Sequence, residues 1–585
     1  SMCLSILTKT FYQRGNDRFY QRLKKEKFMK RKLLFLSTCA FIALSGLSGC
    51  SNNPNNSLSE GDFLEDTFDK DGKLEISFFG IDLDSLQSQT EDTKLIIDFI
   101  ENKFQVKFKY INGNASGWET VLNQYIGGGD VPDVFFHEVG QPAYSNWRDD
   151  DYLFDYGQYL DEYPNLKKAF NRYDEKSMKK FLGGEYYGYP IVMDDLTDSD
   201  IVNQHGMYYR RDWYENLKAK DFTPKSGRKL VDPEDPSFNY LNFYDLCDGF
   251  TNGDPDNNGV NDTYAYALTK DGGAYWFYPI LSMFGVTYDG WHYSASEDKW
   301  LPDCTSDNMK QALDFMADMY DQGFIAQNYA TTLTQTMMKN EFVNGVAGIM
   351  TFNTNYNIGE GILELMEQYE TSTKKVKDIC RCMPIITGID GTKRMYGYSN
   401  KYGFRSISNL ASINKKKKIM SIMDWMLTDE GMTLLNYGIK DKHYKIENGK
   451  IVSLLGKNVN GLEKSLYDSD VAPGVYRIKG LVSWSTLIPT TIKHYEEQMQ
   501  LIKAWDKQYL VANPLQYCSV DTDYALIISQ LTDSISSCYQ SIVNKSNKET
   551  RDSTWNNFVN NYNKKGASYI TAMNMSAEEI GIEKK

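Results

Sequence analysis

Residues 126–138 read IGGGDVPDVFFHE, and this stretch decides the fold. A glycine-rich turn leads directly into the apolar run Val134 to Phe136. A short run of β-branched and aromatic residues bounded by Gly and Pro is typical of a buried strand in a parallel sheet. His137 and Glu138 stand just past the carboxyl end of this strand, where open α/β sheets bind their ligands. We therefore expect a ligand groove to begin at these two residues.

The segments before this strand predict a βαβ opening. Residues 74–79 alternate as a strand, 93–104 carry apolar residues at helical spacing, and 106–111 alternate again. A strand, a helix and a second strand in this order form a parallel unit, and residues 133–136 extend the same sheet. The sequence therefore predicts an α/β fold. Later segments also carry readable patterns, with a strand expected at 347–351 and helices at 308–320, 418–427 and 495–505.

The length and composition exclude several classes of protein. At 585 residues the chain is too long for one ordinary core, so two or more lobes are expected. Hydrophobic residues make up 41% and aromatic residues 14%, which is ample material for buried cores. The formal net charge of -14 argues against nucleic acid as a partner, because phosphate binding requires a basic surface.

The region before the first strand divides into three parts. Residues 29–49 combine a basic start with an apolar run too short to span a bilayer, and small residues then precede Cys50. This pattern resembles the signal peptide and lipobox of bacterial lipoproteins, in which the Cys is lipidated and becomes the mature N-terminus. We therefore expect a lipid on Cys50 and a flexible tether over 50–72; an ordinary signal peptide with a chance Cys is the alternative. Residues 1–28 are interpreted as a non-native or wrongly assigned extension.

Six motifs resemble, in order, those of the bacterial extracellular solute-binding proteins of the sugar-binding type, the group that includes maltose-binding protein. They are DGKL at 71–74, GDVPDVFF at 129–136, YGYP at 187–190, YRRDW at 209–213, FVNGVAGIM at 342–350 and LTDEG at 427–431. The resemblance implies a two-lobe, doubly wound α/β receptor that closes on a sugar by hinge motion. It also implies a monomer on the extracellular face of the cell membrane, held by its lipid anchor, which passes the sugar to the permease subunits of an ABC importer.

The same likeness implies that the chain crosses the hinge three times. The crossings are expected near Asp194, near Tyr396 and between 450 and 470. Each lobe is then discontinuous in sequence, with the groove between the lobes. The expected boundaries are 73–193 and 396–460 for the first lobe, and 194–395 and 461–585 for the second lobe.

Candidate ligand-binding residues follow where the motifs align. Asp194 matches a carboxylate that accepts sugar hydroxyls, and Tyr275 matches an aromatic stacking platform. Sugar rings pack their C–H faces on aromatic rings, and their hydroxyls need charged or amide partners once water is removed. Plain core packing is the alternative for the aromatic run 275–278. The complete expected set is Asp82, His137, Glu138, Asp194, Tyr275, Trp276, Tyr278, Asn355 and Tyr356.

The stretch DPDNNGVND at 254–262 has the spacing of a calcium-binding loop. Oxygen ligands fall at positions one, three, five and nine, a backbone carbonyl at seven, and Gly259 supplies the turn at six. Position twelve is Ala265 instead of the bidentate Glu, so another carboxylate would have to complete the shell. A solvated Asx turn is the alternative. We expect structural Ca²⁺ here, with the ligands Asp254, Asp256, Asn258, Val260 and Asp262.

The motifs of the common hydrolases and nucleotide-binding enzymes are missing. The sequence contains no HExxH pair, no GxSxG elbow and no GxxxxGK[ST] loop. Asp194 and Asp195 are adjacent, whereas glycoside hydrolysis needs two carboxylates about 5 to 9 Å apart across a cleft. We therefore expect a binding protein for a carbohydrate, specifically an oligosaccharide. A receptor for a non-sugar solute such as a peptide, and a surface glycoside hydrolase, are the alternatives.

Overall fold

The structure is a computed structural model, and the part with a described conformation begins at Leu64. It covers 64–113, 117–138, 143–172, 175–192, 201–203, 205–271, 273–354, 356–457, 464–483, 494–518, 520, 522–545 and 547–584. All of these ranges belong to one compact unit, 63–585. Cys50, Asp194 and Asn355 lie outside the described residues, so the predictions made for them stay predictions.

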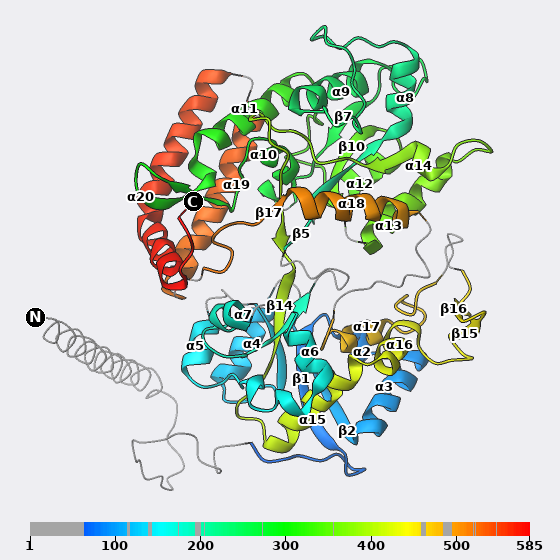
Figure 1. Ribbon diagram of the computed structural model, residues 1–585, viewed down its shortest axis with the longest axis vertical. Coiled ribbons are helices and arrows are strands. Elements are labelled where there is room, and N and C mark those ends of the chain that lie inside the picture. The colour runs from blue at the N-terminus through cyan, green and yellow to red at the C-terminus, as the bar shows by residue number, and fades with distance from the viewer. Residues whose placement is uncertain are drawn as a thin grey trace, which may run out of the picture. The chain divides into compact units, whose positions relative to one another are not determined.

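The first sheet has the strand order β2-β1-β3-β14-β4. Figure 1 labels three of these strands, β1, β2 and β14. Its strands are β1 (Leu74–Ile81), β2 (Val106–Gly113), β3 (Val134–His137), β4 (Tyr189–Val192) and β14 (Lys401–Ile407). β1 runs parallel to β2 and β3, as the sequence predicts. β14 lies antiparallel between β3 and β4, so a late segment of the chain separates two early strands.

Buried polar groups tie the helices of the first lobe to this sheet. Asp133 Oδ2 accepts hydrogen bonds from the Ser77 amide at 2.8 Å and from Lys415 Nζ at 2.9 Å, which joins β3 to β1 and to α15 (Ile413–Met426). Glu101, in α3 (Glu91–Phe104), accepts from the Phe108 amide at 3.0 Å and so fixes α3 against β2. A buried carboxylate needs such partners, because its charge is otherwise costly to desolvate. The second Asp of the GDVPDVFF motif therefore has a structural role.

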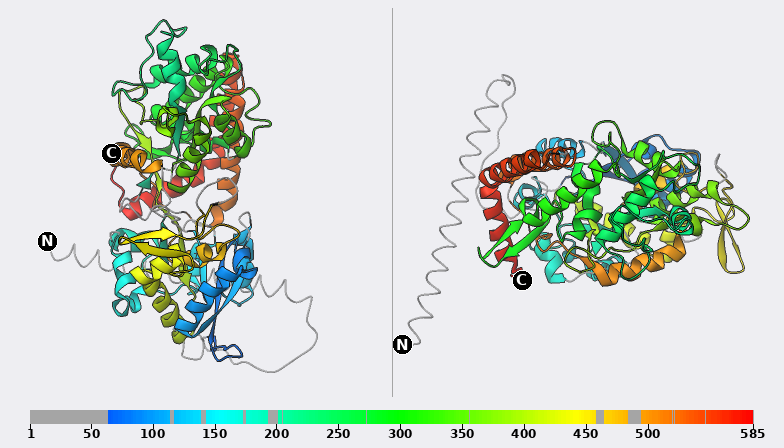
Figure 2. Two further views of the ribbon diagram at one scale, coloured as in Figure 1. Left: turned by 90° about the vertical axis from the view of Figure 1, so that its right-hand side faces the viewer. Right: turned by 90° about the horizontal axis from the view of Figure 1, so that it is seen from above.

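The second sheet has the order β11-β6-β10-β7. Its strands are β6 (His205–Arg210), β7 (Tyr264–Ala267), β10 (Ala347–Asn353) and β11 (Cys380–Cys382). β10 is parallel to β7 and antiparallel to β6. The core around this sheet also includes apolar residues of the C-terminal helices α19 (Ala525–Val543) and α20 (Lys548–Ile580), which lie side by side (Figure 2).

The remaining helices that matter for packing are short or amphipathic. On the first sheet they include α4 (Trp118–Gly127), α7 (Glu175–Phe181) and α17 (Pro473–Lys479); near the second sheet they include α8 (Arg211–Ala219), α9 (Tyr240–Asn252), α10 (Tyr278–Met283), α11 (Asp307–Asp321) and α18 (Tyr495–Tyr509). The helices predicted at 308–320, 418–427 and 495–505 are confirmed as parts of α11, α15 and α18. No helix in the described ranges has the length and apolar character needed to cross a membrane.

The YRRDW motif forms the junction between β6 and α8. Arg210 and Asp212 are 4% and 6% exposed and make a bidentate pair, with both N–O distances 2.8 Å. Lys374 Nζ also donates to Asp212 at 3.1 Å, and the guanidinium of Arg210 lies 4.5 Å from the ring centroid of Tyr369. The motif thus holds the first helix of the second lobe onto its sheet through a buried charge network.

Two short strand pairs lie where the chain passes from one sheet to the other, and we call them the hinge strands. β5 (Ile201–Val202) pairs with β13 (Tyr398–Ser399), and β12 (Met395–Tyr396) pairs with β17 (Leu510–Val511). The second expected crossing, near Tyr396, falls on these strands.

The boundary expected at 460 is wrong for residues 464–483. Leu466, Val475 and Ile478 are buried in the same core as β1 and β3, because α17 packs on α2 (Asp84–Gln87) and α3. These residues therefore belong with the first lobe. The chain returns to the second core in α18, where Ile502 is buried.

Candidate functional site

A cluster of aromatic side chains and one carboxylate surrounds the β5–β13 hinge strands. We call it the hinge cluster, and it consists of His205, Tyr275, Tyr278, Tyr288, Asp289 and Tyr398. Tyr398 is on β13, and His205 begins β6 directly after β5. Tyr275 comes from the 3₁₀ helix η3 (Gly273–Phe277), and Tyr278 begins α10. The ring centroid of Tyr398 lies 4.9 Å from His205, 5.8 Å from Tyr275 and 5.3 Å from Tyr278.

Asp289 is the charged centre of the hinge cluster. Its Oδ1 accepts a hydrogen bond from the Tyr278 hydroxyl at 2.5 Å and another from Thr287 Oγ1. The residue as a whole is exposed, and desolvation of its carboxylate by the surrounding protein raises the pKa of Asp289. These contacts fix the carboxylate on the cluster while leaving acceptor capacity for a ligand.

The tyrosine hydroxyls beside this carboxylate keep their protons. The Tyr288 and Tyr398 hydroxyls are 3.2 Å apart. Burial, and then the negative charge of Asp289, raise the pKa of Tyr398 well above its usual value. The two hydroxyls can therefore donate or accept hydrogen bonds, and Tyr275, Tyr288 and Tyr398 are only partly buried. Aromatic faces next to a carboxylate are the combination that a sugar ring requires.

His205 lies at the back of the hinge cluster. It is 2% exposed, and neither ring nitrogen has a hydrogen-bond partner among the residues that the structure describes. Its ring packs edge to face against Tyr275, with centroids 4.0 Å apart. Burial lowers the pKa of His205 to about 3, so the ring is neutral. The uncharged imidazole packs as an aromatic ring and supports Tyr275 from behind.

The predicted aromatic run 275–278 divides between surface and core. Tyr275 is half-buried and Tyr278 bonds Asp289, so both belong to the cluster. Trp276 is 4% exposed and stacks on Phe352 with centroids 5.5 Å apart. For Trp276 the structure therefore favours the alternative given in the sequence analysis, which is plain core packing.

His137 is a core residue, which corrects its assignment to the groove. The ring is completely buried and stacks between Tyr144 and Phe404, at centroid distances of 5.0 and 5.8 Å. Its Nε2 and Ser406 Oγ are 2.6 Å apart, and burial lowers the pKa of His137 to about 3. The sequence predicts that His137 is exposed, because it stands at the carboxyl end of a strand. In the structure, α5 (Tyr144–Asp149) covers this end of β3.

The other predicted ligand residues are found at two places. Glu138 and Asp82 are partly exposed at the ends of β3 and β1, and Asp82 Oδ2 lies 3.9 Å from an Arg477 nitrogen. Tyr356 begins α13 (Tyr356–Leu365), the helix that follows β10. The structure therefore does not join Asp82 or Glu138 to the hinge cluster, and their role stays a prediction.

Four members of the hinge cluster escaped the sequence analysis: His205, Tyr288, Asp289 and Tyr398. Tyr288 and Asp289 stand in the segment TYDGW, residues 287–291, where aromatic residues flank a carboxylate. That pattern could have identified Tyr288 and Asp289 as candidate site residues from the sequence. Tyr398 carries no local signal, because it reaches the cluster only through the pairing of β13 with β5.

The predicted calcium loop adopts a tight turn. Gly259 has φ 80°, the left-handed conformation that position six requires, and Val260 N donates to Asn258 Oδ1 at 2.7 Å. Asp254 Oδ1 accepts from the Gly259 amide at 3.2 Å, and Lys220 Nζ lies 3.2 Å from the other oxygen. Desolvation and the nearby charge of Asp262 raise the pKa of Asp256. Within the described ranges no three acidic, His or Cys side chains already converge on one point. The oxygen donors and the turn nevertheless fit the kind of ligand set that Ca²⁺ takes.

The comparisons with known proteins agree with this architecture. No family model matches the chain. By sequence it is 27% identical to the lipoprotein LipO of Bacillus subtilis over 58% of this chain and 59% of LipO. It is 24% identical to the polygalacturonan/rhamnogalacturonan-binding protein YtcQ of B. subtilis, over 71% of this chain and 75% of YtcQ. The matched part thus spans less than two thirds of LipO.

Solved structures show the fold. An extracellular solute-binding protein from Bifidobacterium longum subsp. infantis superposes with a TM-score of 0.65 at 16% identity, covering 88% of this chain and 100% of the other. The substrate-binding protein FusA of Streptococcus pneumoniae, solved in complex with kestose, gives 0.58 at 16% identity, covering 87% and 99%. The chain has the two-lobe α/β fold of the solute-binding proteins, as the sequence predicts.

Proposed function

We propose that this protein is an extracellular receptor that captures an oligosaccharide and delivers it to an ABC importer without altering it. The hinge cluster carries the proposal, because Asp289 is held by Tyr278 while partly exposed tyrosine rings stand beside it. The relatives support it: FusA is a fructooligosaccharide ABC transporter substrate-binding protein, and YtcQ binds polygalacturonan and rhamnogalacturonan.

In the proposed complex a sugar ring stacks on Tyr275. One of its hydroxyls donates to the free acceptor positions of Asp289, and the Tyr288 and Tyr398 hydroxyls bond neighbouring oxygens of the ring. A bond to a charged acceptor contributes about 1.5 to 3 kcal/mol. Tyr398 is on a hinge strand. A ligand that contacts both Tyr398 and Asp289 would therefore shift the equilibrium between the open and closed conformations toward the closed one.

Isothermal titration calorimetry tests the proposal. The panel contains kestose, nystose, galacturonan oligomers of two to five units, a human milk oligosaccharide and a peptide mixture. Binding of at least one sugar and of no peptide is expected, and no new reducing ends should form during a long incubation. Peptide binding alone would favour the non-sugar receptor, and new reducing ends would favour a hydrolase.

We propose that the loop 254–262 binds a structural Ca²⁺. The donor types and the φ of Gly259 support this, and a cation would relieve the repulsion from Asp262 that, after desolvation, raises the pKa of Asp256. A solved structure of FusA carries an EF-hand mutation, which shows that a comparable motif exists in a protein of this fold.

Removal of calcium is expected to lower the melting temperature of the wild type. A ligand at a hundredfold excess over its Kd stabilises the folded state by about 2.7 kcal/mol. The double variant Asp254→Ala with Asp256→Ala loses two charged ligands and should show no response to EGTA in differential scanning calorimetry. An equal EGTA response in both proteins would place the calcium elsewhere.

We propose that Cys50 anchors the protein to the membrane. LipO is a lipoprotein, and the pattern around Cys50 supports the same chemistry here. Cys50→Ser is expected to release the protein into the medium or leave it as an unprocessed precursor, because stable anchoring requires two acyl chains. Fractionation followed by immunoblotting measures this, and normal membrane retention of the variant would contradict it.

A further inference from the structure

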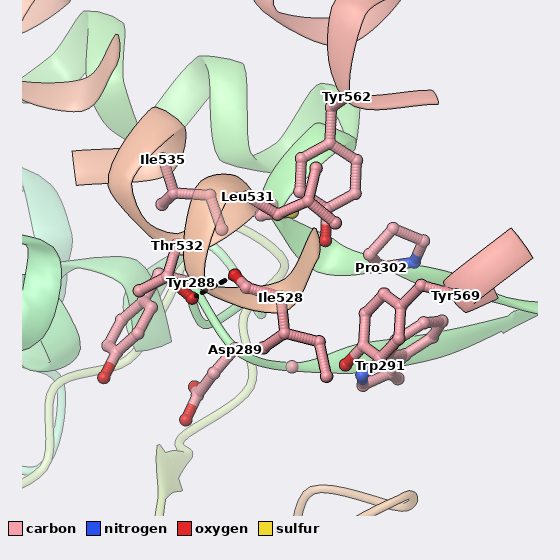
Figure 3. Close-up of a pocket in the computed structure, with 12 residues that line it drawn as sticks. Tyr288, Asp289, Trp291, Pro302, Ile528, Leu531, Thr532, Ile535, Tyr562 and Tyr569 are labelled. Atoms are coloured by element: carbon pink, nitrogen blue, oxygen red, sulfur yellow. Dashed lines mark hydrogen bonds between the residues drawn. The ribbon is translucent and has the colours of Figure 1, made fainter. Parts of the chain in front are cut away.

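A cavity of about 180 Å³ lies directly behind the hinge cluster, and nothing above assigns it a role. One wall is the turn 288–290, with Trp291 and Pro302 of the β-hairpin formed by β8 (Trp291–Ser294) and β9 (Lys299–Pro302). Cys304, in the 3₁₀ helix η4 (Asp303–Thr305) that follows the hairpin, completes this wall. The opposite wall comes from the C-terminal helices. Ile528, Leu531, Thr532 and Ile535 of α19 line it, together with Tyr562 and Tyr569 of α20 (Figure 3).

The lining combines aromatic surfaces with a few polar atoms. Trp291 and Tyr569 pack at 68° with their ring centroids 5.8 Å apart, and the Tyr562 hydroxyl points toward the space between α19 and the hairpin (Figure 3). Thr532 is exposed on the α19 side, and its hydroxyl donates to the Ile528 carbonyl at 3.0 Å. Aromatic and apolar walls with isolated hydroxyls suit the C–H faces and the hydroxyls of a sugar.

The cavity and the hinge cluster share two residues, Tyr288 and Asp289. The carboxylate of Asp289 points away from Tyr562, toward Tyr278 and the hinge cluster, while its backbone borders the cavity (Figure 3). The cavity and the hinge cluster therefore adjoin at the turn that carries Tyr288 and Asp289. The size also sets a limit, because about 180 Å³ corresponds to roughly six water molecules at about 30 Å³ each, enough for one ring but not for a chain.

We propose that this cavity is a second sugar subsite, which takes one further unit of an oligosaccharide whose neighbouring unit stacks in the hinge cluster. This inference rests on the carbohydrate-binding function proposed above. The C-terminal helices then contribute directly to ligand length selection, since α19 and α20 form one whole wall. A ligand too short to reach the cavity would be held by the hinge cluster alone.

Filling the cavity tests the subsite. Thr532→Trp places a large ring at its open side, and Thr532 is exposed, so the substitution should be tolerated by the fold. Gln530→Trp is the matched control: it adds the same side chain to the same helix at an exposed position that does not line the cavity. Calorimetry measures the affinity of each protein for a fructan series up to nystose and a galacturonan series from two to five units, and melting temperature checks the fold.

The wild type is expected to gain at least tenfold in affinity when the sugar becomes long enough to enter the cavity. Thr532→Trp should abolish this gain and leave the affinity for the shortest bound sugar within about twofold, while Gln530→Trp retains the wild-type series. A Thr532→Trp protein that keeps the full length dependence would overturn the subsite. If the wild-type protein bound no member of either series, the carbohydrate function itself would be overturned for these two classes of sugar. Failure of the subsite and failure of the proposed function therefore give different results.

Discussion

Asp212→Ala should reduce the free energy of unfolding by about 3 to 5 kcal/mol, the largest effect of any single change considered for this protein. The variant leaves Arg210 buried at 4% exposure without its bidentate carboxylate. It also deprives Lys374 of an acceptor 3.1 Å away. Two uncompensated cations at the junction of β6 and α8 must then be hydrated or paired at the expense of local packing. Urea denaturation followed by tryptophan fluorescence measures the change.

Glu215→Ala is the matched control for this prediction. Glu215 pairs with Arg211 on the same helix at 2.5 Å, but its side chain is 44% exposed. A solvent-exposed pair of this type contributes about 0 to 1 kcal/mol. If the two variants were destabilised equally, burial of the Arg210–Asp212 pair would not be what holds α8 on the sheet.

Asp289→Ala and Tyr275→Ala are each expected to weaken binding of the cognate sugar by about tenfold to a hundredfold. For Asp289 the reason is the loss of a charged hydrogen-bond acceptor, which contributes about 1.5 to 3 kcal/mol. For Tyr275 it is the loss of a stacking surface, whose burial and ring contacts contribute a comparable amount. Calorimetry with the sugar identified in the panel gives both values.

Two further variants separate binding from folding. Removing Asp289 also leaves the Tyr278 hydroxyl without its acceptor, which costs stability. Asp289→Asn keeps an oxygen for that hydroxyl, so its melting temperature should stay near the wild-type value while its affinity still falls about tenfold through loss of charge. Asp298→Ala removes a carboxylate that is 75% exposed on the nearby hairpin, and it should change neither. Normal sugar binding by Asp289→Asn and Tyr275→Ala would place the ligand outside the hinge cluster.

The sequence predicted the elements whose pattern is local. β1, β2 and β3 were found because apolar residues alternate or run together between turn residues, and the structure confirms all three. β14 gives no such signal, because Arg405 stands in the middle of it and reads as a solvent-facing residue. In the structure Arg405 is 1% exposed, lies 5.2 and 5.1 Å from the rings of Phe78 and Phe136, and donates from Nε to the Gly480 carbonyl at 2.8 Å.

The candidate site was predictable only in part for a related reason. Tyr275 and Tyr278 stand out in one short run of aromatic residues, but Asp289 and Tyr398 join them through tertiary contacts across separate segments. No periodicity encodes such a meeting. For His137 the error was the reverse, because a residue predicted to belong to the site lies in the core. A position at the end of a strand is normally open, but the six-residue helix α5, which the sequence analysis did not predict, buries His137.

The place of β14 between β3 and β4 also sets the order in which the two sheets can form during synthesis. All four strands of the second sheet lie between residues 205 and 382, so that sheet can be completed before residues 401–407 emerge. Until then β3 has no partner on one side, and β4 cannot join the first sheet at all. The first sheet, whose strands begin earlier in the chain, is therefore completed after the second sheet. During that interval the first sheet exposes unpaired strand edges, which can pair with other chains and which a chaperone would have to protect.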